Sequence, residues 1–130
     1  MTQTSGGFEL PTWEDSIYAE PEGESYARVS NTKIWSGGIT GESSAELITM
    51  RAASGSAAYV GIERLDVALD GRKGTFVLAH VAQGDASGGS MTVTVVQGSG
   101  TGELVGLTGS MQIRRSDEGA HTWEFEYTLG

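Results

Sequence analysis

The most constraining feature of the sequence is an alternation of apolar and polar residues with a period of two, which recurs along nearly the whole chain. It is clearest over residues 122–129, where Trp123, Phe125, Tyr127 and Leu129 are the apolar members. Side chains of a β-strand point alternately to its two faces, so this pattern is typical of a strand with one buried face. A chain built from such strands buries those faces together, in a sandwich or a barrel.

Seven further segments have strand character, and short glycine-bearing breaks separate most of them. Residues 42–53 also fit a helix, because Ser43 and Glu46 have the spacing of a capping box, but the neighbouring strands favour a strand there. The seven predicted strands are residues 8–13, 26–35, 42–53, 57–69, 75–81, 91–95 and 110–115. With residues 122–129 they predict an all-β fold of about eight strands, with residues 1–130 forming one domain.

Charge and composition exclude several classes of function. Lysine and arginine number 8 and acidic residues 17, a net charge of −9, which argues against binding nucleic acid or an anionic membrane surface. The chain has no cysteine, which excludes disulfides and thiol chemistry. No apolar run is long enough to span a membrane, and the N-terminus does not resemble a secretory signal. A cytoplasmic location is the resulting expectation.

No cofactor, metal or triad motif is present. The run of glycines at 98–102 lacks the spacing and the following helix of a phosphate loop, so it is interpreted as a structural turn. The sequence contains no G-x-S-x-G elbow and neither of the common paired-histidine zinc motifs. We therefore expect no cofactor and no metal.

Four polar residues lie within apolar-rich strands, where burying a charge is costly unless it is paired. Glu63 shares a face with Tyr59, whereas Arg64 is on the opposite face, and Glu46 and His80 lie in other strands. These groups either face solvent, form a structural ion pair, or line a barrel interior and contact a ligand. Alternation alone does not say which face is the inner one.

Several segments also form a recognisable set of motifs. The most specific are Gly-Ile-Glu-Arg at 61–64 and Gly-Ser-Gly-Thr-Gly-Glu-Leu at 98–104, accompanied by Trp35-Ser-Gly-x-Ile39-x-Gly41 and Gly71-Arg-Lys-Gly-Thr-Phe. Together they resemble an uncharacterised bacterial family known only as a domain of unknown function, grouped with the allene oxide cyclase-like barrels. The resemblance covers nearly the entire chain.

The resemblance implies a closed antiparallel barrel of about eight strands, lipocalin-like in shape, with a hydrophobic cavity and assembly into a dimer or trimer. Allene oxide cyclases close a ring in an unstable fatty-acid epoxide without cofactor or metal, mainly by holding it in one conformation. The implied partner is therefore a hydrophobic small molecule, and the implied activity is that of a cofactor-free cyclase or isomerase. A non-catalytic binding barrel and a filled structural barrel are the alternatives.

In such a cavity, the candidate catalytic residues are Glu63, Glu46 and His80. A carboxylate or an imidazole there would stabilise charge that develops on a bound molecule. The aromatic residues among the ligand-binding candidates would fit an ordinary packed core as well as a cavity wall. The candidate ligand-binding residues are Trp35, Met50, Tyr59, Arg64 and Tyr127.

Overall fold

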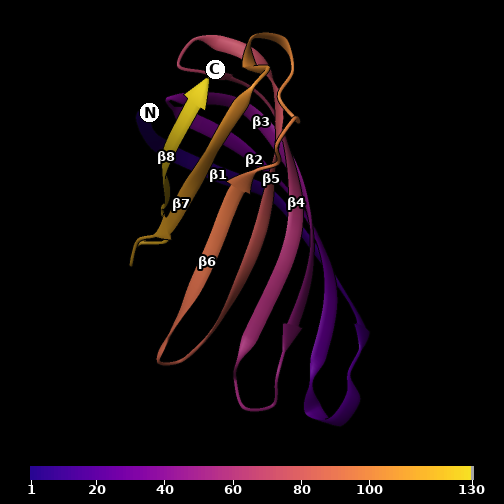
Figure 1. Cartoon of the computed structure of the whole chain (residues 1–130). Helices are drawn as coiled ribbons and strands as arrows, with labels where there is room; N and C mark the ends of the chain where they lie inside the picture. The colour runs from indigo at the N-terminus through magenta and orange to yellow at the C-terminus, as the bar shows by residue number, and fades with distance from the viewer. Residues whose placement is uncertain (130) are drawn as a thin grey trace.

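The computed structural model describes residues 1–129, so Gly130, the end of the expected domain, lies outside the described residues. It is a closed antiparallel barrel in which each of eight strands pairs with the next and β8 pairs with β1 (Figure 1). This confirms the predicted all-β fold. The strands are β1 (Thr2–Ala19), β2 (Ser25–Gly37), β3 (Ile39–Arg51), β4 (Ala57–Leu69), β5 (Arg72–Asp85), β6 (Gly88–Val95), β7 (Leu107–Arg115) and β8 (His121–Leu129).

Two short 3-10 turns, η1 (Pro21–Gly23) and η2 (Gly102–Leu104), are the only helical segments of residues 1–129. Neither is long enough or apolar enough to cross a membrane. Residues 42–51 of the segment for which a helix was the alternative form a strand, because β3 pairs with β4 along its whole length and with β2 from Gly41 to Arg51. The first strand is much longer than the predicted 8–13, since β1 pairs with β8 through its first residues and with β2 through the rest.

The hairpin between β4 and β5 shows how a tight turn fixes the strand register. Asp70 and Gly71 form a two-residue loop between the paired residues Leu69 and Arg72, and both have positive φ, 47° and 88°. Two-residue hairpin loops need this conformation to match the strand twist, and glycine adopts it without strain. The register that follows places alternate residues of β4 and β5 inside the barrel.

The glycine-rich turn at 98–102 closes the barrel beside β5. Ser99 Oγ accepts a hydrogen bond from the Val77 N–H at 3.0 Å, and the Thr101 N–H donates to the Thr75 carbonyl at 2.8 Å. These bonds satisfy the part of the β5 edge that β6 does not reach. The segment interpreted as a structural turn therefore serves as one.

Sheet pairing is incomplete toward the other end of the barrel. β1 pairs with β8 only as far as Phe8, and β6 pairs with β7 only at Val93 and Thr94. The second half of β1 and the start of β6 therefore each have one edge without a neighbouring strand among the described residues. Figure 1 shows these strands continuing below the ends of β7 and β8, where the barrel becomes an open trough.

Side-chain size divides the interior in the same way. Around the complete end the inward residues are large, and Phe76, Phe125 and Trp123 are almost fully buried there, with the two phenylalanine rings stacked at 6.0 Å. Toward the trough, β2 and β3 carry the small residues Ala27 and Ala45 facing inward. Small side chains cannot fill a barrel of eight strands, so one end is packed and the other is hollow.

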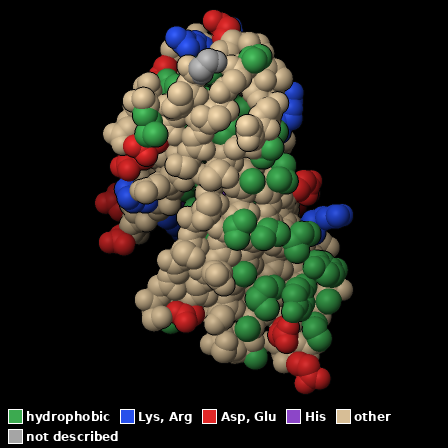
Figure 2. Space-filling view, viewed as in Figure 1, with side chains coloured by type: hydrophobic (Ala, Val, Ile, Leu, Met, Phe, Trp, Pro, Cys, Tyr) green, Lys and Arg blue, Asp and Glu red, His purple; other side chains and the backbone are tan. Residues whose placement is uncertain are grey.

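The outer face carries its own apolar surface. Ile48 of β3, Val60 of β4 and Val81 of β5 are neighbours in one cross-strand row, with Ile62 beside them, and all four are between 41% and 55% exposed. Figure 2 shows hydrophobic side chains gathered over this lower part of the molecule. A contiguous apolar group of this kind is typical of an interaction surface.

The packed end should determine the stability of the barrel. Leu65→Ala removes a side chain that is 0% exposed, and we expect it to lower the free energy of unfolding by about 2–5 kcal/mol. Ile62→Ala, on the same strand but 55% exposed, should change it by no more than about 0.5 kcal/mol. Urea unfolding of both variants measures the difference, and equal losses would show that the inner and outer faces of β4 have been assigned wrongly.

Candidate functional site

The hollow end contains two adjacent cavities. The outer cavity, about 770 Å³, lies in the trough and is lined by residues of β1 to β6. The inner cavity, about 320 Å³, lies deeper, toward the packed end. The two cavities are adjacent, because they share the lining residues Trp13, Thr49, Tyr59 and Met91.

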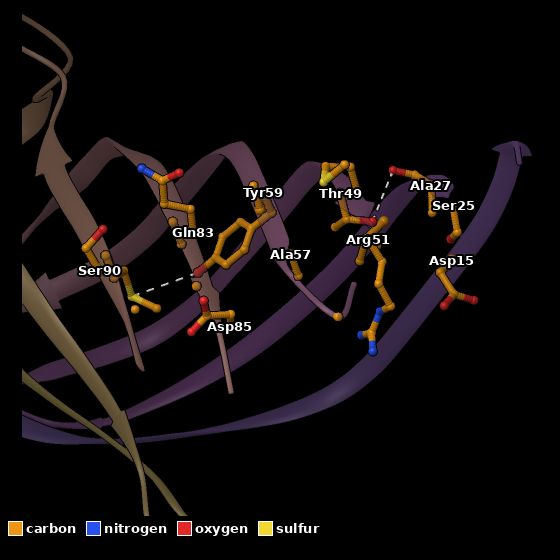
Figure 3. Close-up of a pocket in the computed structure, with 18 of the residues that line it drawn as sticks. Asp15, Ser25, Ala27, Thr49, Arg51, Ala57, Tyr59, Gln83, Asp85 and Ser90 are labelled. Atoms are coloured by element: carbon orange, nitrogen blue, oxygen red, sulfur yellow. Dashed lines mark hydrogen bonds between the residues drawn. The ribbon is translucent and has the colours of Figure 1, made fainter. Parts of the chain in front are cut away.

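The wall of the outer cavity is mixed in character (Figure 3). Tyr59 projects from β4 with its hydroxyl directed to Met91 Sδ, 3.9 Å away, while Thr49 donates a long hydrogen bond of 3.5 Å to the Ala27 carbonyl. Arg51 and Asp85 place charges at the rim. The outer cavity thus suits a molecule with an apolar body that is partly in contact with water.

A buried carboxylate lies in the wall of the inner cavity. Glu63 is 0% exposed, and both of its oxygens are hydrogen-bonded. Oε1 accepts from Lys33 Nζ at 3.2 Å and lies 2.8 Å from His80 Nε2, whereas Oε2 accepts from Ser43 Oγ at 2.6 Å. Trp35 Nε1 in turn donates to Ser43 Oγ at 2.9 Å. Four strands, β2 to β5, therefore meet at one side chain.

These partners keep Glu63 ionised. Burial by itself would raise the pKa of this carboxyl, but the hydrogen bond with His80, the charge of Lys33 and the hydrogen bond from Ser43 together lower the pKa below its ordinary value of 4.5. An ionised carboxylate only accepts hydrogen bonds, so His80 Nε2 carries a proton toward it. The free ring nitrogen of His80 is then Nδ1, for which none of the described residues provides a hydrogen bond.

Lys33 is held between the carboxylate and aromatic rings. Its side chain is 9% exposed, and Nζ lies 4.5 Å from the centre of the Phe8 ring and 5.4 Å from that of Trp35. The faces of aromatic rings attract a cation, so these contacts add to the ion pair with Glu63. An ammonium group so little solvated interacts strongly with any negative charge that enters the inner cavity.

Two further titratable side chains border the inner cavity as neutral groups. Burial, and then the charge of Glu63, raises the pKa of the Tyr59 hydroxyl, so it remains a hydrogen-bond donor at neutral pH. Burial, and then the charges of Arg115 and Lys33, lowers the pKa of His121, whose ring stacks on Phe8 at 4.9 Å. Of the lysine and arginine side chains that line this cavity, Lys33 forms an ion pair with Glu63, at 3.2 Å.

The structure brings only some of the candidate residues together. Glu63, His80 and Tyr59 share the inner cavity, with the rings of His80 and Tyr59 6.5 Å apart, and Met50 lines the outer cavity. Trp35 and Tyr127 are buried in the packed end, where Trp35 supports Ser43.

Two candidate residues lie outside the barrel. Glu46 and Arg64 are exposed on the outer face, where Glu46 accepts a hydrogen bond from Ser30 at 2.8 Å. Each is next to an inward-facing residue of its strand, Ala45 or Glu63, and so points to the opposite face of the sheet. From these positions the two side chains cannot contact a ligand in the interior. This corrects the expectation that Glu46 is a catalytic candidate and Arg64 a ligand-binding one inside the cavity.

Sequence reasoning missed Lys33, Ser43 and Asn31, which also lines the inner cavity. The sequence did contain a signal that Asn31 and Lys33 face inward. They alternate with Val29 and Trp35 on one face of β2, and all four residues are buried. In the part of the chain that the structure describes, no three His, Asp or Glu side chains form a group that could hold a metal ion.

Comparison with known proteins places the chain in a family. The family model described as a protein of unknown function, DUF3224, matches residues 4–127. The chain belongs to the DUF3224 family. No curated protein matches it.

Among solved structures, a DUF3224 protein of unknown function from Shewanella oneidensis MR-1, determined at 1.84 Å resolution, resembles the chain. The two are 32% identical, with a TM-score of 0.89, and the match covers 100% of this chain and 98% of the other. The barrel is therefore a property that this chain shares with a second DUF3224 protein.

Removing the buried carboxylate should produce a pH-dependent loss of stability. At pH 7 we expect Glu63→Gln to lower the free energy of unfolding by about 3–5 kcal/mol, because Lys33 stays buried without its counter-charge. Since the folded pKa of Glu63 is lowered, its contribution is present above the ordinary value of 4.5 and is lost as the pH falls through the folded pKa.

Urea unfolding of both proteins from pH 7 to pH 3 measures the difference, which should narrow only below about pH 4.5. The matched control is Glu46→Gln on the outer face, which should stay within about 0.5 kcal/mol of the unaltered protein. If Glu63→Gln and the unaltered protein differ in free energy of unfolding by the same amount from pH 7 to pH 3, the charge of Glu63 does not contribute to stability.

Proposed function

We propose that the interior binds a hydrophobic small molecule and rearranges it without a cofactor, as an isomerase or cyclase. The observation that carries the proposal is the pairing of Glu63 with His80 next to Lys33, at the inner end of a cavity with apolar walls. Buried charges are costly, and a histidine oriented by a carboxylate is a common proton acceptor in enzymes. The outer cavity would hold the apolar body of the ligand.

The proposed chemistry moves one proton. His80 Nδ1 takes a proton from a carbon next to a carbonyl group of the ligand, and the electrons of that C–H bond move to the carbonyl oxygen. Glu63 is a positioning residue, which orients the ring and stabilises the imidazolium through Nε2. The ammonium of Lys33 stabilises the negative oxygen. When the ligand carries a C=C bond between the β and γ carbons, the proton returns to the γ carbon as electrons move back from the oxygen. The double bond is then between the α and β carbons, and His80 is restored.

A cyclisation would use the same site in a different way. Grouping with the allene oxide cyclase-like barrels would imply that the walls fold a flexible chain into one reactive conformation. Tyr59 and Met50 line the outer cavity and would form part of such walls. Orientation alone contributes several kcal/mol, up to about 7–11 kcal/mol in well-oriented reactions.

The second candidate function is binding without chemistry. The outer cavity opens to solvent beside the β1 edge that β8 leaves unpaired beyond Phe8. A wide mouth lets a ligand enter and leave quickly, but it excludes water poorly, and chemistry on an unstable intermediate needs water excluded. This opening favours a carrier or a sensor of the same hydrophobic molecule.

Assembly into a dimer or trimer is part of the same proposal. The row formed by Ile48, Val60 and Val81 on the outer face supports it, because a second copy would cover apolar surface that is otherwise in water. This face is opposite the cavity wall, so association there leaves the ligand site accessible.

Filling the cavity should abolish binding. We expect Ala27→Phe, which projects a ring into the outer cavity, to weaken the binding of 1-anilinonaphthalene-8-sulfonate at least roughly tenfold in a fluorescence titration. Ala82→Phe fills the cavity from β5 and provides a second variant in case the first does not fold. Thr108→Phe, exposed on β7 outside the cavities, is the control and should bind normally. Equal binding by all of them would place the dye outside the barrel.

Solvent deuterium exchange separates the two candidate functions. The probe is 2-decanone in D₂O, with incorporation beside the carbonyl followed by mass spectrometry. If His80 is the proton acceptor, the protein accelerates exchange, and His80→Ala reduces that acceleration by at least about 100-fold. Glu46→Gln on the outer face should exchange like the unaltered protein. Binding of the ketone without accelerated exchange would contradict the enzyme and support the carrier.

A further inference from the structure

The inner cavity carries a positive charge although the protein is strongly acidic. Of the described residues that line it, Lys33, Arg114 and Arg115 are basic and only Glu63 is acidic, whereas the whole chain has 8 basic and 17 acidic residues. Lys33 balances the charge of Glu63, and Arg114 forms an ion pair with Glu124 at 3.3 Å. Arg115 forms no ion pair with the described residues, so it leaves this cavity with one positive charge.

Arg115 lies where a molecule in the cavity has access to it. It is the last residue of β7 and is paired across the hairpin with His121, the first residue of β8. Arg115 is on the same face of β7 as the buried Met111, and His121 is on the same face of β8 as the buried Trp123, so both are on the inner face. Because β7 and β8 end where the trough begins (Figure 1), Arg115 is exposed and His121 only half-buried.

The surroundings of His121 make this end of the cavity suited to an anion. Burial lowers the pKa of His121, and the charges of Arg115 and Lys33 lower it further. The centre of the Phe8 ring lies 4.9 Å from that of His121 and 4.5 Å from Lys33 Nζ. Since Lys33 is paired with Glu63, Arg115 is the cation with N–H donors to offer, and the neutral imidazole adds one N–H donor beside it.

We propose that Arg115 binds the carboxylate of the ligand, with His121 as an additional hydrogen-bond donor. The ligand class is a monocarboxylate with an apolar tail, because a guanidinium matches a carboxylate with two parallel hydrogen bonds and one negative charge neutralises the cavity. This inference rests on the proposed binding of a hydrophobic small molecule in the interior, and it adds the charge that the molecule must carry. In the proposed isomerisation the carboxylate is a second group, separate from the carbonyl on which the chemistry takes place.

The charges of the outer cavity give the ligand its direction. Asp15, Arg51 and Asp85 are the charged residues among those that line the outer cavity, so its net charge is −1. A carboxylate is repelled there and attracted by Arg115 in the inner cavity. The ligand would therefore bind with its carboxylate at the end of the β7–β8 hairpin and its tail in the outer cavity, of about 770 Å³.

The outer cavity has apolar surface for the tail to cover. Trp13 is 53% exposed, Ile17 is 55% exposed and Met91 is 45% exposed, and all three line this cavity. Removing such surface from water is favourable, at roughly 25 cal/mol per Å². The tail thus contributes affinity, while Arg115 selects ligands by their charge.

The experiment compares decanoate with decanamide, which has nearly the same shape and no charge, by isothermal titration calorimetry on the full chain at pH 7. We expect the unaltered protein to bind decanoate roughly tenfold more tightly, because hydrogen bonds between two charged groups are stronger than those to a neutral amide. Arg115→Gln should bind both equally, and Arg115→Glu, a second variant, should favour decanamide. The matched control is Arg64→Gln, the same change of charge on the outer face of β4, which should keep the preference.

Failure of this inference is distinguishable from failure of the proposed function. Equal affinity of the unaltered protein for decanoate and decanamide would show that the site does not select a carboxylate. A preference that survives in Arg115→Gln, or that Arg64→Gln loses as well, would show that Arg115 is not the group that selects it. Each of these results overturns the role of Arg115 and leaves the proposed binding intact. If neither decanoate nor decanamide binds, the proposed binding of a hydrophobic molecule in the interior is itself contradicted.

Discussion

The structure depends on one buried carboxylate. Glu63 is removed from water completely, so its charge is tolerable only because Lys33, His80 and Ser43 all bond to it. These partners come from three other strands, and a slip of β2, β3 or β5 by one residue would turn its partner to the outer face. The same interaction thus fixes the register of half the barrel and places a charged cluster beside a cavity.

The cavity itself comes from the distribution of small and large side chains. Inward positions around Phe76 and Trp123 are filled by rings, whereas Ala27 and Ala45 leave space at the other end. Gly61 leaves room for the side chain of Leu47. A Cβ at position 61 would lie 2.1 Å from Leu47 Cδ2, so the Leu47 side chain packs directly over the glycine. The charged cluster lies where the packed region meets the hollow one, which is where a ligand with one polar end would place that end.

Much of the fold could be predicted from the sequence, because alternation and glycine-bearing turns are local signals. The site was less predictable. Glu46 and Glu63 lie in similar apolar-rich strands, yet one is outside and the other inside, and only the pairing of β3 with β4 decides which. Lys33 points to the same face of β2 as Trp35. However, a lysine between apolar residues gives no local indication that a carboxylate 30 positions later will neutralise it. Register and charge pairing are properties of the closed sheet rather than of any segment.

The central claim is that a molecule with an apolar tail enters the barrel and does not merely adhere to its outer surface. Methyl chemical shifts measured by NMR during titration with decanoate test it directly, because methyl groups occur on both faces. The account predicts shifts for Val29, Leu47 and Met91, which line the cavities, and none for Ile48 and Val60 on the outer face. Shifts confined to Ile48 and Val60, with the interior methyl groups unchanged, would contradict it.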